Sequence, residues 1–395
     1  MIDIVYNLLI IGLVVVWILK ARFHGISALA LWLKRHNFAV LVVLWILFSL
    51  CLAYNVLNFD KLTEETDVDD AVNAAVVNLL NGTNPYTEPV VPRFNEMGHF
   101  WLIGGGDHKP TWSYGPYNYL PLDLTVYAGM HKLLGSLGMP WWFVLANVVF
   151  SSIGLYLLRG VVKSGWRYYV PVAGMVILFL SLTNTSLTLL LICAALRVRE
   201  EPLAQRENMS LVLFGLASLT KIFAIVPFAV LALYGVKSSI SERDWHRFGR
   251  ILASLGICAV IATVLLVPFG PANVINSTVF VWSAGSASDD APPVGGSLLG
   301  ALIPESEFYS LVCMACVLAA LVLSFRFKLP VDRVLLVFVV LLLVIAKSSY
   351  SPLFLAGLFL TLRIRNVSLE CPRRNVRSGE AGSDAGIRQP GAKPE

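Results

Sequence analysis

LFGLASLTKIFAIVPFAVLAL, residues 213–233, carries a single charged side chain, Lys221, between two apolar blocks. Similar blocks recur along the chain. They are about 15–20 residues long, which is the length of helix that crosses a hydrocarbon core of roughly 30 Å. Because an open sheet leaves backbone polar groups unpaired in lipid, the blocks predict an all-α fold, a polytopic transmembrane helical bundle.

The composition agrees with a chain that lies mostly in lipid. Of 395 residues, 57% are hydrophobic and 14% are charged, and the mean hydropathy is +0.72. Soluble domains are roughly 45–50% apolar and about 25% charged. The net charge of +5 arises mainly from Lys and Arg beside apolar blocks, as membrane topology alone requires, so no nucleic-acid partner is predicted. The six cysteines indicate packing inside spans and no disulfide framework.

Basic clusters between the blocks predict the orientation of eleven spans. The first two blocks enclose four basic residues and no acid, which places that segment in the cytoplasm and the N-terminus outside. The first block lacks a preceding basic stretch, so we expect a retained span and no cleaved signal peptide. Later clusters place the C-terminus inside. The predicted spans are near 4–19, 38–57, 140–158, 168–183, 185–198, 208–222, 223–237, 250–269, 308–325, 331–347 and 348–363.

The chain divides into four predicted parts. These are two N-terminal spans (1–57), an outer catalytic loop (58–134), the remaining transmembrane bundle (135–365) and a disordered cytoplasmic tail (366–395). Within the outer loop, the apolar stretch 117–134 would invert the later topology if it spanned, so we expect a re-entrant or interfacial helix. The segment 270–307 has a Gly/Pro/Ser-rich centre and is interpreted as a mobile outer loop.

The outer catalytic loop begins with an amphipathic pattern. Apolar residues recur at helical spacing over 68–80 and Gly82 ends the run, which predicts a short helix lying on the membrane surface. Asp67, Asp69 and Asp70 open this helix. Acids at that position cap a helix and favour its positive end. A carboxylate held at the membrane surface could equally act as general base toward an acceptor hydroxyl, so both interpretations stay open.

Aromatic residues crowd the segment just before the re-entrant stretch. Such residues commonly form the interfacial belt of a membrane protein. Aromatic faces also suit the apolar C–H surface of a sugar ring, and a neighbouring amide supplies directional hydrogen bonds. The candidate sugar-binding residues are Tyr114, Tyr117, Asn118 and Tyr119.

Two lysines at predicted outer turns are candidates for binding an anion. A lysine facing lipid at mid-membrane costs a few kcal/mol, so Lys221 must either reach the outer surface or face a cavity with a partner. Lys347, with Tyr350 close after it, has the same two interpretations. Lysines lining one cavity would neutralise a leaving phosphate. No set of three metal ligands with suitable spacing occurs in the outer loop, so no metal is predicted.

The first-loop pattern resembles the GT-C superfamily of polyprenyl-phosphate-sugar-dependent glycosyltransferases. It is most similar to the bacterial and archaeal mannosyltransferases related to the phosphatidylinositol-mannoside elongating enzymes. The family pattern is an acid, a valine three positions later, a Leu-Leu pair seven further and a glycine two beyond. It matches Asp69, Val72, Leu79, Leu80 and Gly82, although Asn73 stands where an aromatic residue is usual.

The resemblance implies roles for several residues. It selects Asp69 as the base, with Asp67 and Asp70 as alternatives. It extends more weakly over residues 60–365, where it implies a donor-phosphate site at Lys221 and a related polar position at Asn184.

The resemblance also implies an activity. A hexose, mannose-like, would be transferred with inversion from a polyprenyl-phosphate sugar to a lipid- or glycan-linked acceptor on the outer face of the cell membrane. Lipid phosphate carries less charge than a nucleotide diphosphate, so no metal or other cofactor is expected. The alternatives are a lipid-linked sugar transporter or flippase, because intramembrane lysines also mark substrate pathways, and a polysaccharide ligase or polymerase.

Overall fold

The computed structural model describes residues 67–87, 91–94, 112–139, 142–161, 183–199, 205–278 and 308–327, with isolated positions at 46, 169, 170, 173, 174, 176, 177, 180, 329, 334, 337 and 341. Several predicted segments therefore lie outside the described residues. They are the spans near 4–19 and 348–363, nearly all of those near 38–57 and 331–347, half of the span near 168–183, most of the loop 270–307, and the tail 366–395.

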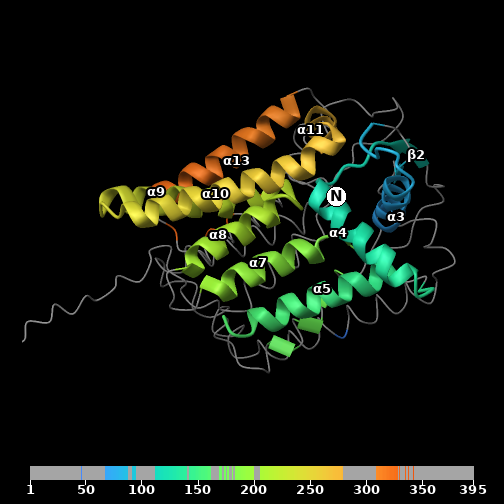
Figure 1. Ribbon diagram of the computed structural model, residues 1–395, viewed down its shortest axis with the longest axis horizontal. Coiled ribbons are helices and arrows are strands. Elements are labelled where there is room, and N and C mark those ends of the chain that lie inside the picture. The colour runs from blue at the N-terminus through green and yellow to red at the C-terminus, as the bar shows by residue number, and fades with distance from the viewer. Residues whose placement is uncertain are drawn as a thin grey trace, which may run out of the picture.

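The described part of the chain is helical, as predicted, apart from one short two-stranded ribbon (Figure 1). Its elements, in chain order, are α3 (Asp67–Leu80), β1 (Val91–Phe94), β2 (Trp112–Gly115), α4 (Pro121–Met130), the π-helix η2 (His131–Gly135), α5 (Trp142–Leu158), α7 (Ser186–Arg199), α8 (Gln205–Ser218), the 3-10 helix η3 (Ile222–Ala224), α9 (Ile225–Ser241), α10 (Trp245–Leu266), the 3-10 helix η4 (Val267–Phe269), α11 (Pro271–Thr278) and α13 (Phe308–Arg326).

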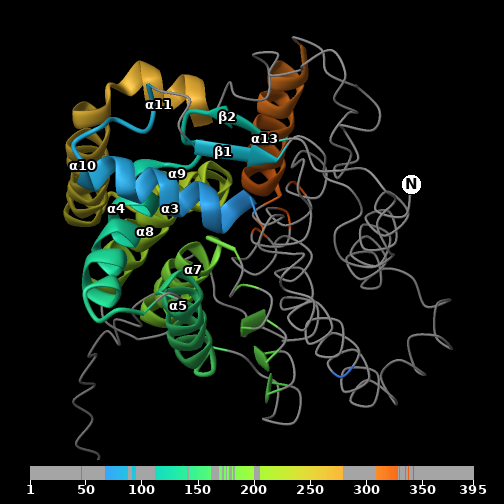
Figure 2. The same cartoon turned by 90° about the vertical axis from the view of Figure 1, so that its right-hand side faces the viewer.

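Five long helices and α13 form the bundle. Helix α7 packs between α5 and α8, α10 packs against α8 and α9, and α13 packs against α9 (Figures 1 and 2). Their shared core includes Leu155, Leu189 and Phe214, all 2% exposed or less. Gly154 lets α5 approach α7 backbone to backbone, because a Cβ there would lie 3.0 Å from the Cα of Leu190.

One helical run in the described residues, Trp245–Phe269, is long and apolar enough to cross a membrane on length and composition. Several other apolar helices, including α5 and α9, are shorter. The eleven-span arrangement therefore stays a prediction.

Helix α3 is the amphipathic helix that the sequence predicts. Val72, Ala75 and Val76 are fully buried, whereas Asn73 is exposed. The chain reverses at Gly82, whose φ of +80° lies in the left-handed region that glycine adopts at no steric cost. The apolar face of α3 contacts a different surface from the one predicted. It packs on α4 and on buried tyrosines of the following loop, so protein covers it where a membrane surface was expected.

The antiparallel ribbon is an addition that the sequence analysis lacks. Strand β1 pairs with β2 in the register Val91 with Gly115 and Phe94 with Trp112. Tyr114 lies in β2, opposite Pro92. The ribbon lies beside α3 and leads the chain into α4 (Figure 2).

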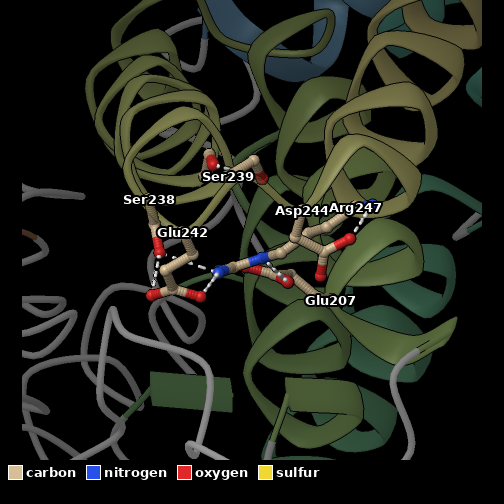
Figure 3. A network of polar contacts seen from close by, with 7 residues as sticks. Glu207, Ser238, Ser239, Glu242, Asp244 and Arg247 are labelled. Carbon is tan, nitrogen blue, oxygen red and sulfur yellow. Dashed lines mark hydrogen bonds and ion pairs between the residues drawn. The ribbon is translucent and has the colours of Figure 1, made fainter.

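An arginine clamp joins three helix ends (Figure 3). It lies at the turn from α9 to α10, which is at the end of the bundle away from α3 (Figure 1). Arg247 donates from Nε and Nη2 to the two carboxylate oxygens of Glu207, at 3.0 and 2.8 Å. Its Nη1 donates to Oγ of Ser238 at 2.8 Å, and Glu242 lies 3.7 Å away. Asp244 caps α10 by accepting from the backbone N–H of Arg247. The clamp therefore joins the start of α8, the end of α9 and the start of α10.

Candidate functional site

The start of α4 places an acid inside the protein. Leu120 is extended, and Pro121 begins the helix with φ already restricted to helical values. Asp123 follows in the first turn, where its N–H donates to the carbonyl of Leu120 at 3.0 Å. Its side chain is fully buried. A buried carboxyl group requires partners, because its charge is otherwise costly.

Two side chains donate to one oxygen of this carboxyl group. Oδ2 of Asp123 accepts from the hydroxyl of Tyr117 at 2.9 Å and from Nδ2 of Asn184 at 2.8 Å. The other oxygen, Oδ1, is buried and has no hydrogen-bond partner among the described residues. Asn184 stands just before α7, so the contact joins the loop before α4 to the start of a bundle helix.

The amide of Asn184 extends the chain of contacts to Lys221. Oδ1 of Asn184 accepts from Nζ of Lys221 at 2.7 Å. Lys221 is half-buried in the turn between α8 and η3, where its N–H donates to Ala217 and its carbonyl accepts from Ala224. Nζ also lies 3.9 Å from the centroid of the Tyr119 ring, which is a cation–π contact.

Buried tyrosines fix the segment that carries these contacts. The hydroxyl of Tyr86 donates to the carbonyl of Tyr119 at 2.8 Å, and the N–H of Tyr117 donates to the carbonyl of Pro85 at 2.7 Å. The rings of Tyr117 and Tyr119 meet edge to face at 5.3 Å between centroids. Asn84 donates from Nδ2 to the carbonyl of Phe269 at 2.9 Å, which ties the same loop to the end of the α10–η4 run.

Burial dominates the electrostatics of the cluster. It raises the pKa of the Asp123 carboxyl, while the charge of Lys221 and the hydrogen bonds from Asn184 and Tyr117 act in the opposite direction. Burial, followed by the charge of Asp123, raises the pKa of Tyr86 and Tyr117 well above the ordinary value for a phenol. The two hydroxyls therefore stay protonated and serve as donors.

A second group of buried polar side chains lies nearby and has hydrogen-bond partners of its own. The hydroxyls of Tyr127 and Ser186 both donate to Oδ1 of Asn147, within the contact between α4, α5 and α7. All three residues are fully buried. The bonds of this group join α4, α5 and α7 to one another.

The structure brings together four of the candidate residues from the sequence: Tyr117, Tyr119, Asn184 and Lys221. Asn118 is half-buried between the two tyrosines. Asp67, Asp69 and Asp70 form the first turn of α3, and their side chains, like that of Tyr114, lie outside what is described. Lys347 and Tyr350 also lie outside the described residues.

Asp123 is the member that the sequence analysis did not select. The signal was present, since an acid inside an apolar stretch must find a partner or a polar cavity. Within the described residues, no group of three His, Cys, Asp or Glu side chains gathers as a metal site requires.

Comparison of the chain with protein-family models, curated proteins and solved structures finds no match.

Proposed function

We propose that the chain is an integral membrane glycosyltransferase. It transfers a hexose from a polyprenyl-phosphate sugar to a lipid- or glycan-linked acceptor at the outer face of the cell membrane. The observation that carries the proposal is the Lys221 ammonium group, held by Asn184 and the Tyr119 ring at the α3 end of the bundle.

The outward surface of the bundle supports a membrane location. Ile257, Val260, Val264 and Val267 of the α10–η4 run are each at least half exposed. Exposed apolar residues scattered singly are ordinary, but a continuous series along one long apolar helix suits lipid.

The distribution of charge supports the orientation. Arg159 follows the last residue of α5, and Arg197 and Arg199 lie in the last turn of α7. The arginine clamp lies at the same end, where α8 begins and the chain turns from α9 to α10. Asn184 precedes the start of α7 and Lys221 follows the end of α8, so both lie at the other end, with the tyrosine-rich loop that contacts them. Under the positive-inside rule, the clamp end is cytoplasmic and the Lys221 end is outer.

The contacts of Lys221 suit a sugar phosphate. An ammonium group is a compact point charge with three N–H donors, which suits the oxygens of a phosphate. The half-buried Asn118 lies in the same segment as Tyr119, and its amide can supply directional hydrogen bonds to sugar hydroxyls.

The transfer is a single displacement. Asp69 takes the proton of the acceptor hydroxyl, whose oxygen forms a bond to the anomeric carbon. The bond from that carbon to the phosphate oxygen breaks, and its electron pair leaves with polyprenyl phosphate. Lys221 stabilises the departing anion. The anomeric configuration inverts because attack and departure occur on opposite faces.

The three aspartates at the start of α3 provide the test. A general base contributes about 10²–10⁴-fold in rate, whereas losing a helix cap costs about 1 kcal/mol of stability. Asp69→Asn keeps the shape and much of the capping ability but cannot accept a proton. We expect it to abolish release of decaprenyl phosphate from decaprenyl-phosphate mannose, with octyl mannoside as acceptor, in nanodiscs.

The matched controls are Asp67→Asn and Asp70→Asn, which should stay within about tenfold of wild type. An inactive Asp67→Asn beside an active Asp69→Asn would move the base to Asp67. Near-normal release by all three single variants would refute an acid–base role for this loop.

A lipid-linked sugar transporter is the second candidate. It is favoured by Oδ1 of the fully buried Asp123, which has no hydrogen-bond partner in the described part of the chain. Buried acids near a lysine mark proton-coupled pathways in membrane proteins. Transport would move decaprenyl-phosphate mannose between the leaflets of a proteoliposome without forming a new glycoside, whereas transfer forms the glycoside and releases decaprenyl phosphate.

A further inference from the structure

Asp123 takes no direct part in the proposed transfer, although one side chain separates its carboxyl group from Lys221. The contacts run in an unbroken series. Tyr117 donates to Asp123 at 2.9 Å, Asn184 donates to the same oxygen at 2.8 Å, and Lys221 donates to Asn184 at 2.7 Å.

The carboxyl group determines which end of the Asn184 amide faces Lys221. An ionised carboxylate only accepts hydrogen bonds, so the NH₂ group of the amide must point toward Asp123. The amide oxygen is then left to face the ammonium group, which only donates. With the amide reversed, its NH₂ group would meet the ammonium group donor to donor. Asp123 thus turns Asn184 into an acceptor for Lys221.

The carboxyl group is itself held in place. Tyr117 is fully buried, and its ring contacts Tyr86 and Tyr119 at 5.7 and 5.3 Å between centroids. Its backbone N–H is bonded to Pro85. The hydroxyl that bonds Asp123 therefore belongs to a side chain with little freedom to move. The contact between Tyr117 and Tyr119 also positions the Tyr119 ring beneath Lys221.

We propose that Asp123 is a positioning residue, which acts through Asn184 to fix the ammonium group of Lys221 where the donor phosphate binds. The proposal rests on the proposed function in one respect, the identity of the anion. The orientation of Lys221 by Asp123 is a property of the chain and can be measured without any transfer.

The binding experiment uses radiolabelled decaprenyl phosphate and the full chain in nanodiscs. Lys221→Ala should raise the Kd at least about tenfold, because it removes a charge-assisted hydrogen bond. Asp123→Asn keeps the shape, but its amide can donate as well as accept, so it should raise the Kd about three- to tenfold. In the Lys221→Ala background, Asp123→Asn should change the Kd by less than about twofold, since residues that act through one contact are not additive.

Tyr117→Phe and Tyr127→Phe form a matched pair. Both tyrosines are fully buried in the same core, and each loses one hydroxyl. Of these two tyrosines, Tyr117 bonds Asp123, whereas Tyr127 bonds Asn147. Tyr117→Phe should weaken binding of decaprenyl phosphate, and Tyr127→Phe should leave it within about twofold of wild type. Equal weakening by the two variants would mean a general loss of packing and would overturn the proposal.

A second measurement separates this proposal from the proposed function. The rate at which an N-hydroxysuccinimide ester acylates Lys221, followed by mass spectrometry, reports how firmly the ammonium group is held. The rate should rise several-fold in Asp123→Asn and Tyr117→Phe and stay unchanged in Tyr127→Phe. Unchanged acylation in Asp123→Asn would overturn the positioning role. Faster acylation in a chain whose wild type does not bind decaprenyl phosphate would support the positioning role and refute the lipid-phosphate site.

Discussion

A carboxylate buried as completely as that of Asp123 is destabilising unless its neighbours offset the loss of water. Here two hydrogen bonds and the charge of Lys221 oppose the effect of burial, but burial is the largest influence and leaves the pKa raised. The folded protein therefore binds a proton at this site more readily than the unfolded chain does. Stability must then depend on pH through Asp123.

We expect Asp123 to make the wild type less stable relative to Asp123→Asn as pH rises. Below about pH 4, the pKa of an unfolded aspartate, the acid is protonated in both states and its charge has no effect. As pH rises through the raised pKa of the folded state, the buried carboxyl group loses its proton, and the free energy of unfolding of the wild type falls. The free energy of unfolding of the neutral Asn variant lacks this decline with pH. It otherwise differs from that of the wild type by a constant amount.

Thermal unfolding of the two proteins in detergent, in steps from about pH 4.5 to 8, would measure the difference. The melting temperature of the variant minus that of the wild type should increase with pH. A difference that stays constant over the range would contradict the raised pKa.

Part of the site could be predicted from residue types alone. Lys221 stands out because it is charged at the end of an apolar block, and Tyr117 and Tyr119 because aromatic residues gather there. Asn184 was selected only through the resemblance to a family. Their assembly around Asp123 could not be predicted, since Asn184 lies 61 residues after it and only the packing of α4 on the bundle brings the two together. A sequence identifies groups that require partners but does not pair them.

At the scale of the helices, the close approach of α5 to α7 depends on Gly154. A Cβ at this position would lie 3.0 Å from the Leu190 Cα and 3.3 Å from its nitrogen, and backbone cannot move aside as a side-chain tip can. We expect Gly154→Ala to lower the free energy of unfolding by about 1–3 kcal/mol, the usual cost of overpacking.

Gly256→Ala is the control, because this helical glycine in α10 has open space around its Cα. There alanine should be neutral or stabilise by up to about 1 kcal/mol through its higher helix propensity. Unfolding with increasing denaturing detergent would compare the two. A stable Gly154→Ala would show that α5 and α7 can separate without cost.

The arginine clamp provides the second prediction at this scale. Glu207→Gln leaves Arg247 buried without its bidentate carboxylate, and removing one partner of a buried pair costs about 3–5 kcal/mol. Glu242→Gln changes a carboxylate that is 56% exposed and 3.7 Å from the same arginine, so it should cost under about 1 kcal/mol. The midpoint of unfolding in detergent should fall for the first variant and barely change for the second. Equal midpoints would contradict a buried clamp.

The helix bounds show where hydrophobic periodicity is enough to predict a helix from the sequence and where it is not. The predicted blocks near 140–158, 185–198 and 308–325 correspond to α5, α7 and α13 within a few residues. Helix α10 begins at Trp245, five residues before its apolar block, because Asp244 caps it and Arg247 is bonded within the clamp. The ribbon was missed since β1 contains a proline, which is unusual within a strand.

At the scale of the whole molecule, topology is the property to measure. Cysteines placed singly near positions 90 and 285, in a variant without the native cysteines, should react with an impermeant maleimide from outside intact cells. Cysteines near 30, 163 and 245 should react only after the membrane is opened, because the basic clusters keep those segments in the cytoplasm. Labelling of position 163 from outside would make 117–134 a true span and invert the order of the later elements.

The series of contacts from Asp123 to Lys221 has a consequence for biogenesis. Asn184 is made 61 residues after Asp123, and Lys221 a further 37 residues later. At roughly 5–20 residues per second, a ribosome takes about 3–12 s to reach Asn184 alone. Throughout that interval the nascent chain has Tyr117 as a partner for Asp123 but lacks Asn184 and Lys221. The bond from Asn184 to Asp123 therefore cannot form until the start of α7 has been made, and the bond from Lys221 to Asn184 forms later still.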